Sequence, residues 1–383
     1  MASIYLDHNA TTPIRPEARD AVIRAMSVGG NPSSVHCCGR AARTMLENAR
    51  ADIARGVKAR AQDVVFTSGG TEANNLAIEG AISTGQVKRI ITSSTEHDAV
   101  SNYAISTGLP VELIPVTPTG LADIDWLKNR LENWNADTDG RPLVCVQAVT
   151  SESGVIQPVN DIGLLVREAG GLYHIDAVQA LGKTGFDFAA SGAHYAAISA
   201  HKIGGPQGCG ALILACDAPF DVARKGGGQE KGRRSGTENV AGAYGFAAAL
   251  KAMQACGSDC ERLSALRDRI EAEVMKAVPC ARLIGADAPR TANTTAIALP
   301  CWDGGMQVIA LDLSGVCVSA GSACTSGKAA VSRAWSAVVG EDLARCAIRV
   351  SLGWTTTEAD VEAFIKTWLD EYARVAPRLK ELA

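Results

Sequence analysis

The residues best suited to chemistry follow short apolar stretches. In "YAAISAHKIGG", His201 and Lys202 come after an apolar run and before a glycine turn. A lysine at such a place is either solvated or a nucleophile that forms a Schiff base when its pKa is lowered. In "LYHIDAVQ", Asp176 ends another apolar run and Gln179 follows it. A buried carboxylate needs a cationic partner, whereas an exposed one could simply cap the next helix.

Two further motifs hold groups suited to an anion and to a planar ring. "FTSGGTEANN" places Gly69 and Gly70 directly before Thr71. Unpaired N–H groups at a helix start suit a phosphate, although the same residues could form only a tight turn. "TEHDAV" places His97 after an apolar run. That imidazole could stack on a ring, act as an acid or base, or serve a structural role.

Three segments later in the chain hold a thiol, a cationic loop and a buried arginine. "SAGSACTSG" surrounds Cys324 with small residues, which suits an accessible thiolate nucleophile, although most free cysteines are simply buried. "GGGQEKGRRSGTEN" (226–239) gathers glycine, cations and Thr237, and would either close over an anion or remain a solvated loop. Arg349 lies in apolar "AIRVSLG", where it needs a substrate carboxylate or an internal Asp or Glu.

The elements that position these residues alternate from about residue 60 to 250. Short apolar stretches predict strands at 63–68, 89–94, 111–116, 142–149, 172–177, 195–200 and 210–215. Helical patterns lie between several of them, the clearest at 71–83. Apolar strands alternating with helices predict a mostly parallel sheet that is buried on both faces.

After about residue 257 the pattern changes. An amphipathic helix is predicted over 261–278, and strands over 293–300, 316–321 and 347–353. A further helix follows at 357–375. We therefore expect a smaller α+β domain after the larger α/β domain.

Composition excludes several classes of protein. The chain has 383 residues, about right for two domains, and its 47% apolar and 20% charged residues indicate a globular protein. A net charge of −4 argues against nucleic acid as the main partner. No apolar run approaches the roughly 20 residues that span a bilayer, and the N-terminus has no secretion signal. We expect a cytoplasmic protein that does not bind membranes.

The twelve cysteines predict neither disulfides nor a structural metal site. Their spacing is irregular and no Cys-x-x-Cys pair occurs. Most are expected to be buried, passive thiols, and we assign no mechanistic role to adjacent Cys37 and Cys38.

Taken in order, the motifs resemble those of the cysteine desulfurases of the nitrogen-fixation and iron–sulfur-assembly type, a branch of the class V aminotransferase group. They run through nearly the whole chain as "YLDHNATT", "NPSSVH", "FTSGGTEANNLAI", "TEHDAV", "DAVQALGK", "SAHKIGGPQGCGAL", "GGGQEKGRRSGTEN", "GSACTSG" and "IRVSLG". The resemblance implies a fold-type I pyridoxal-phosphate homodimer. Each chain would have a large domain at 14–256 with a mostly parallel seven-stranded sheet, and a small α+β domain formed by 1–13 with 257–383.

The resemblance also implies roles for individual residues. Lys202 would carry pyridoxal 5'-phosphate as an aldimine, Asp176 would pair with the pyridinium nitrogen, and His97 would lie over the ring. Gln179 would bond the phenolic oxygen, next to Ser151. The residues that would hold the phosphate are Gly70, Thr71, Ser199, His201 and Thr237 of the partner subunit. Those that would hold the substrate carboxylate are Asn31 and Arg349.

The reaction implied by the resemblance converts L-cysteine to L-alanine. The Cys324 thiolate would take the substrate sulfur as a persulfide and pass it to an acceptor or iron–sulfur scaffold protein. The small residues around Cys324 would let the thiol travel between the cofactor and that acceptor. No intrinsic metal site is expected, and Cys324 would bind iron only transiently while a cluster forms.

Three features depart from the family pattern. Ser151 replaces the usual Asn at the phenolic oxygen, and "SAGSAC" replaces "SSGSAC". "AAVSRAWSAV" stands where a Pro-Ser-His segment usually follows, so the far end of the cysteine loop and the acceptor could differ. The sequence does not distinguish nitrogenase-specific from general iron–sulfur supply.

Other functions fit parts of the sequence. A selenocysteine lyase or an aminotransferase would keep the cofactor, but an aminotransferase needs no thiol such as Cys324. A thiol-rich metal or iron–sulfur carrier would do no catalysis, and the absence of paired Cys motifs together with Lys202 and Asp176 disfavours it.

Overall fold

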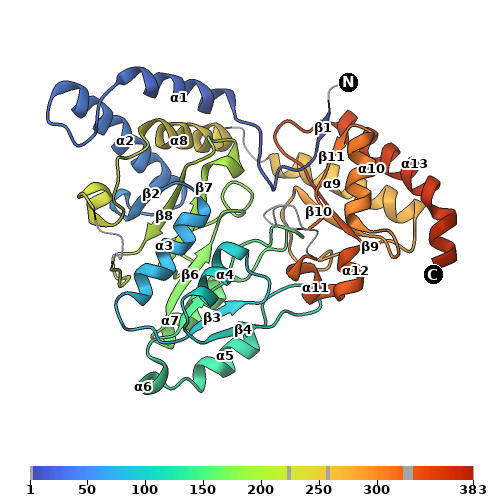
Figure 1. Ribbon diagram of the computed structural model, residues 1–383, viewed down its shortest axis with the longest axis horizontal. Helices are drawn as coiled ribbons and strands as arrows, with labels where there is room; N and C mark the ends of the chain where they lie inside the picture. The colour runs from blue at the N-terminus through green and yellow to red at the C-terminus, as the bar shows by residue number, and fades with distance from the viewer. Residues whose placement is uncertain (1–2, 222–225, 256–258, 322–330, 383) are drawn as a thin grey trace.

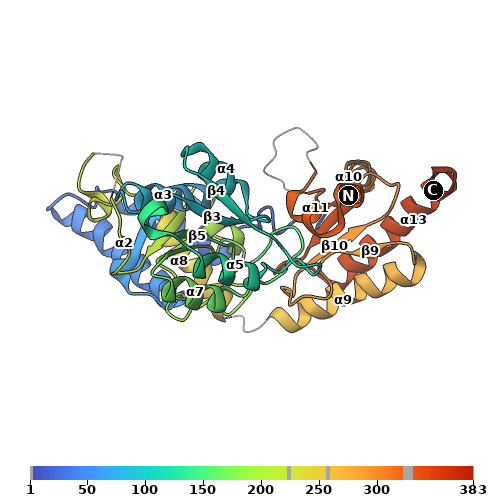
Figure 2. The same ribbon diagram turned by 90° about the horizontal axis from the view of Figure 1, so that it is seen from below.

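The structure is a computed structural model that describes residues 3–221, 226–255, 259–321 and 331–382. Cys324 lies outside the described residues. Two parts, each with its own sheets and helices, lie side by side along the longest axis of the molecule (Figure 1, Figure 2). Within the described ranges, no helix is long and apolar enough to cross a membrane.

The larger part is built on a seven-stranded sheet with the order β2-β8-β7-β6-β5-β3-β4. Its strands are β2 (Val64–Thr67), β3 (Ile90–Ser93), β4 (Val111–Ile114), β5 (Leu143–Cys145), β6 (Leu172–Asp176), β7 (Tyr195–Ser199) and β8 (Gly210–Leu214). Paired strands are parallel, except that β8 is antiparallel to both β2 and β7. The predicted, mostly parallel α/β sheet is confirmed.

Helices cover both faces of this sheet. They are α1 (Pro16–Val28), α2 (Cys37–Gly56), α3 (Gly70–Ile82), α4 (Asp98–Ser106), α5 (Ile124–Glu132), α6 (Ala136–Asp139), α7 (Val159–Glu168) and α8 (Val240–Ala255), with 3₁₀ helices at Ala61–Asp63, Ala200–Ile203 and Gln229–Gly232. Along β7, Ala196 and Ile198 join one apolar cluster, while Tyr195 and Ala197 join another. Because successive strand residues face opposite sides, both faces of the sheet are buried.

The smaller part contains two short sheets. β9 (Arg282–Leu283), β10 (Thr294–Ala298) and β12 (Ala347–Ser351) form one, and β11 (Val316–Cys317) pairs with β1 (Ile4–Tyr5) in the other. Its helices are α9 (Asp259–Ala277), α10 (Gly304–Leu313), α11 (Arg333–Val339), α12 (Glu341–Arg345) and α13 (Glu358–Leu382). Buried side chains such as Trp302, Phe364 and Trp368 form its core.

The N-terminal residues connect the two parts. β1 pairs in parallel with β11, so the chain starts against the smaller part (Figure 1). It then crosses to the larger part, where the Thr12 N–H donates to the His201 carbonyl at 3.1 Å. The Arg15 N–H donates to the Gly204 carbonyl at 2.8 Å. This crossing places residues 9–12 directly beside Lys202.

Candidate active site

Most of the predicted functional residues line one cavity of about 140 Å³. It lies at the carboxyl ends of β3, β5, β6 and β7, the edge at which α/β sheets bind ligands. The predicted residues that line it are Gly70, Thr71, His97, Ser151, Asp176, Gln179, Ser199, His201, Lys202 and Arg349. The structure therefore brings them together, while their individual roles in binding stay predictions.

Lys202 is held by the N-terminal crossing. It lies in the 3₁₀ turn Ala200–Ile203, which follows β7. Its Nζ donates to the carbonyl oxygens of Asn9 at 2.6 Å and Ala10 at 2.8 Å. Two backbone carbonyls thus hold the ammonium of the predicted Schiff-base lysine at the cavity wall.

His201, the neighbour of Lys202, is kept neutral by its surroundings. Burial, followed by the charges of Lys202 and Lys183, lowers the pKa of His201 to about 4. Its Nδ1 lies 3.2 Å from Thr11 Oγ1. A neutral imidazole offers this cavity one hydrogen-bond donor and no added charge near pH 7.

Asp176 ends β6 with its carboxylate held from two sides. Asn74 Nδ2 donates to Asp176 Oδ2 at 2.8 Å, and the Val178 N–H donates to Oδ1 at 2.9 Å. Asn74 Oδ1 lies 2.8 Å from Nε2 of His174, whose pKa burial lowers to about 3. A neutral His174 donates from Nε2, which orients the Asn74 amide with its NH₂ toward Asp176. Among the described residues, Asp176 has no ion pair, so a cation bound in the cavity would complete its environment.

The start of α3 offers an anion site. Gly70 and Thr71 are the first residues of α3, whose first N–H groups lack intrahelical partners. A Cβ atom on Gly70 would lie 2.6 Å from Val178 Cγ2, so glycine is required for this close packing. Ser199 Oγ is buried and has no hydrogen-bond partner among the described residues. These donors suit a phosphate group.

His97 precedes α4 and caps it. Its Nδ1 accepts from the Ala99 N–H at 3.0 Å, and the Val100 N–H donates to its carbonyl at 2.9 Å. Because Nδ1 is an acceptor, the neutral ring carries its proton on Nε2. The ring is half-buried and lines the cavity, which fits both the stacking and the acid–base role.

Arg349 crosses between the two parts of the molecule. Its side chain is buried on β12, and Nη2 pairs with Asp7 Oδ1 at 2.7 Å. Nη1 donates to the Ser151 carbonyl at 3.4 Å, while Nε has no partner among the described residues. The internal ion pair considered from the sequence is present, and the guanidinium also faces the cavity. Ser151 Oγ donates to Glu152 Oε2 at 2.7 Å.

Asn9 links the predicted residues and was given no role from the sequence. Its carbonyl also accepts from Gln179 Nε2 at 2.8 Å, and its Oδ1 accepts from Lys183 Nζ at 2.7 Å. Lys183 Nζ donates in addition to Gln179 Oε1, and burial holds the pKa of Lys183 well below its usual value. Asn9 lies in the motif "YLDHNATT" and Lys183 in "DAVQALGK". Their places in these motifs were the one feature of the sequence that could have indicated a role in the site.

Three predicted residues are not placed at the cavity. Asn31 and Thr237 are exposed and do not line it within the described chain. Thr237 was expected to act across a dimer, so its prediction concerns the partner subunit. Both predictions remain untested, as does that for Cys324, which lies outside the described residues.

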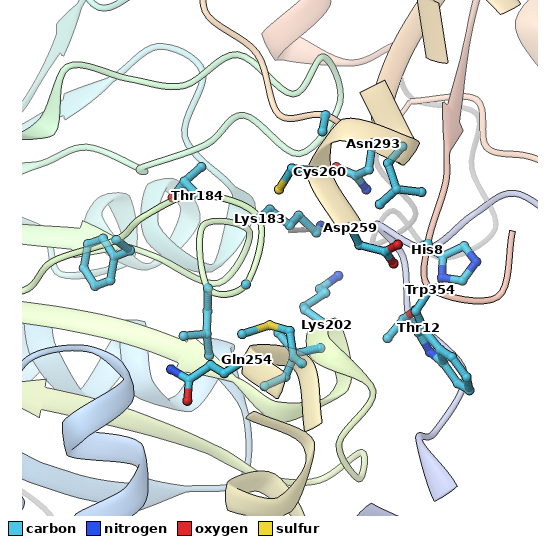
Figure 3. Close-up of a pocket in the computed structure, with 18 of the residues that line it drawn as sticks. His8, Thr12, Lys183, Thr184, Lys202, Gln254, Asp259, Cys260, Asn293 and Trp354 are labelled. Atoms are coloured by element: carbon cyan, nitrogen blue, oxygen red, sulfur yellow. Dashed lines mark hydrogen bonds between the residues drawn. The ribbon is translucent and has the colours of Figure 1, made fainter. Parts of the chain in front are cut away.

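A second cavity, of about 550 Å³, adjoins the first (Figure 3). Lys202 lines both cavities, and the N-terminal crossing contributes His8 and Thr12 here. Side chains from both parts of the molecule, including Lys183 and Asn293, surround it (Figure 3). The smaller cavity alone contains Asp176, His97 and Arg349. The candidate chemistry therefore belongs to the smaller one.

A sheet edge with a lysine, a carboxylate and an anion site suits an α/β enzyme that binds a phosphate-bearing cofactor. The family model "Aminotransferase class-V" matches residues 4–364, and the chain belongs to this family. It is 37% identical over 382 residues to the "IscS-like cysteine desulfurase" of Mycobacterium tuberculosis, covering 97% of this chain and 96% of that protein. The "Cysteine desulfurase" of Cereibacter sphaeroides is 38% identical over 374 residues, covering 96% and 95%.

Solved structures agree with this family. A "NifS-like protein" from Rickettsia africae has a TM-score of 0.88 at 34% identity, covering 97% of this chain and 99% of that one. The resemblance predicted from the motifs and the fold-type I architecture are both confirmed.

Proposed function

We propose that the protein is a pyridoxal-phosphate-dependent cysteine desulfurase that converts L-cysteine to L-alanine. The observation that carries the proposal is the meeting of Lys202, Asp176 and the start of α3 in one cavity. The full-length similarity to cysteine desulfurases supports the choice of substrate.

The residues present fit the cofactor. Asp176 is a buried carboxylate that would pair with a protonated ring nitrogen, and Lys202 would hold the aldehyde carbon. The Gly70 and Thr71 N–H groups, with Ser199 Oγ, would hold the phosphate. Gln179 and Ser151 are proposed to face the phenolic oxygen. Bound pyridoxal phosphate supplies an electron-withdrawing ring that stabilises negative charge on the substrate α-carbon.

The chain's own residues would orient the substrate and move its protons. Arg349, which lines the cavity while Nη2 pairs with Asp7, would bind the substrate carboxylate. Lys202 would take the α-proton, since its Nζ lies at the cavity wall. His97, with its proton on Nε2, would act on the substrate from the cavity side.

Cys324 would accept the sulfur. Its thiolate would form an S–S bond to the substrate sulfur while the substrate C–S bond breaks. The electron pair of that bond stays with carbon, which gains protons to become alanine. L-cysteine and a thiol thus become L-alanine and a persulfide, with no external oxidant.

The proposed assembly follows the family expectation. Residues 14–256 would form the cofactor domain, and 1–13 with 257–383 the small domain. Two chains would form a homodimer in which Thr237 of the partner subunit reaches the phosphate. The persulfide would pass to an acceptor or iron–sulfur scaffold protein in the cytoplasm. Light scattering tests the dimer, and cell fractionation tests the location.

Removing Lys202 tests the cofactor assignment. Purified wild-type protein should be yellow and should form alanine and sulfide from L-cysteine in the presence of a reducing thiol. Lys202→Ala should lose the absorption band and at least about 10³-fold of the turnover, because the covalent link and the proton acceptor are both removed. Lys88→Ala, at an exposed position outside the cavity lining, is the lysine control and should keep the band. A colourless wild type that gains no band with added pyridoxal phosphate would refute the proposal.

A further inference from the structure

The segment that departs most from the family pattern makes a contact across the two parts of the molecule. "VSRAW" leads into α11, whose first residue is Arg333. Arg333 Nη2 donates to three groups at the start of α4: Ser101 Oγ at 2.6 Å, Asp98 Oδ1 at 2.7 Å and the Glu96 carbonyl at 3.2 Å. These acceptors belong to the larger part, whereas α11 belongs to the smaller part.

The acceptors surround His97. Glu96 and Asp98 are its neighbours in the chain, and Ser101 Oγ donates to the His97 carbonyl at 3.3 Å. In the same turn, the Ala99 N–H donates a hydrogen bond to His97 Nδ1. Arg333 therefore forms hydrogen bonds with the residues on both sides of His97, and these residues set the position of the His97 ring.

Next to Arg333, the start of α11 is packed into the core of the smaller part. Ser332 caps α11 by accepting from the Trp335 N–H at 3.3 Å, and Trp335 is buried at 1% exposure. Trp335 shares an apolar cluster with Ala296 and Ala347, which lie on β10 and β12. Because Arg349 lies on β12, one packed unit joins Arg333 to the arginine that faces the cavity.

We propose that Arg333 is a positioning residue that fixes the His97 imidazole relative to Arg349 across the cavity. This inference rests on the proposed function, in which a substrate held by Arg349 must present its reacting carbon to the His97 side. Arg333 is not among the residues that line the cavity in the described part of the chain, so its effect would be indirect. Its guanidinium is half-exposed, so loss of the contact should leave the fold intact while the relative placement of the two walls loosens.

Two substitutions isolate the contact. Arg333→Ala removes it, and Arg345→Ala is the matched control. Arg345 lies on neighbouring α12, and its side chain is 50% exposed against 49% for Arg333. Within the described part of the chain its one ion pair is with Glu341 of its own helix, at 2.8 Å. Arg333→Lys keeps the charge but on a shorter side chain without the planar guanidinium, so it should restore only part of the effect.

Activity gives the first readout. Small misplacements of reacting groups cost up to about 100-fold in rate, so Arg333→Ala should lower kcat for L-cysteine about 10- to 100-fold. KM and the absorption of the bound cofactor should stay within about twofold, because Arg349 and Lys202 are untouched. Asp98→Asn removes the charge at one of the three contacts and should lower kcat less than Arg333→Ala does. The double variant Arg333→Ala/Asp98→Asn should lose no more than Arg333→Ala alone.

Hydrogen exchange in the cofactor-free protein gives a second readout that does not depend on turnover. The Ala99 and Val100 amides, which bond to His97, should exchange faster in Arg333→Ala than in wild type or Arg345→Ala. Wild-type kcat in Arg333→Ala, additive losses with Asp98→Asn, or unchanged exchange would overturn the inference. A wild type that makes no alanine would instead refute the proposed function.

Discussion

At the scale of single residues, burial sets the protonation of groups that lie beside the cavity. His201 has a pKa near 4 and His174 a pKa near 3, in each case chiefly because burial disfavours the charged ring. The site can therefore hold a hydrogen-bond donor at His201 and an oriented amide at Asn74 without extra positive charge. Lys202 and Arg349, which line the cavity, supply the positive charge that would act on anionic groups of substrate and cofactor.

Glu96 is a buried acid that burial also keeps uncharged, as it does the two histidines. It is buried at 4% exposure, and burial, with the Asp176 carboxylate adding to it, raises the pKa of Glu96 to about 8. In the unfolded chain the value is near 4.5. The folded state therefore keeps a proton that the unfolded state loses, and stability falls as pH rises from about 4.5 through 8.

Glu96→Gln should remove this dependence. At pH 5 the variant and wild type should differ little, whereas at pH 9 the variant should be more stable by about 1–3 kcal/mol. Urea unfolding of both proteins from pH 5 to 9 measures the difference. Glu168→Gln, at an exposed position on α7, is the control and should follow wild type. Equal pH dependence in all three proteins would contradict the account.

Some residues escaped prediction because their partners are distant in sequence. The sequence showed Asn9 only as one residue of a motif. Its hydrogen bonds with Gln179 and Lys183 arise because the N-terminal crossing brings it beside them. For Arg349 the sequence left open a substrate carboxylate or an internal acid as its partner. The structure shows an internal acid, Asp7, 342 positions away, and the substrate role stays a prediction. Residue type and spacing report local chemistry but not such long-range pairings.

At the scale of elements, the start of α3 is the feature on which the proposed cofactor binding would depend most. Of the two glycines in "SGGT", only Gly70 has a neighbour in the position where its own Cβ atom would lie. A Cβ on Gly70 would lie 2.6 Å from Val178 Cγ2, whereas a Cβ on Gly69 would meet nothing within 4 Å. The Gly69 φ of 162° is extended backbone that any residue adopts.

Gly70→Ala should therefore weaken pyridoxal-phosphate binding at least about tenfold, which corresponds to about 1.4 kcal/mol. The displaced helix start would no longer present its N–H groups to the phosphate. Titration of cofactor-free protein, followed by absorbance, measures the affinity. Gly69→Ala should bind like wild type, and Val178→Ala should partly restore the Gly70→Ala variant. Equal affinities for both alanine variants would show that packing at Gly70 is unimportant.

Element prediction succeeded where hydrophobic pattern and burial coincide. Each predicted strand of the seven-stranded sheet is present, because strands buried on both faces read as continuous apolar runs. The strand expected over 316–321 is shorter, since β11 covers only Val316–Cys317 beside a two-residue β1. A strand can form β-sheet hydrogen bonds only along the length of its partner, and here the partner has two residues. The local sequence pattern gives no information on the length of a partner that is distant in the chain.

At the scale of the whole molecule, the candidate site exists only where the two parts meet. Lys202 and Asp176 come from the large sheet, Asn9 from the N-terminal crossing, and Arg349 from β12 of the smaller part. Ion pairs and hydrogen bonds such as Arg349–Asp7 and Arg333–Asp98 span these segments. Substrate binding and sulfur transfer would therefore depend on how the parts are held together.

The most direct test of the account is the fate of sulfur from L-cysteine on Cys324. Wild-type protein is incubated with one equivalent of L-cysteine without reductant. The alanine formed is then quantified, and the mass of the peptide containing Cys324 is measured by mass spectrometry. We predict one extra sulfur atom on Cys324 for each alanine formed, and neither product in a Cys324→Ser variant that still binds the cofactor. Alanine formation at the wild-type rate in that variant, or sulfur on another cysteine, would contradict the account.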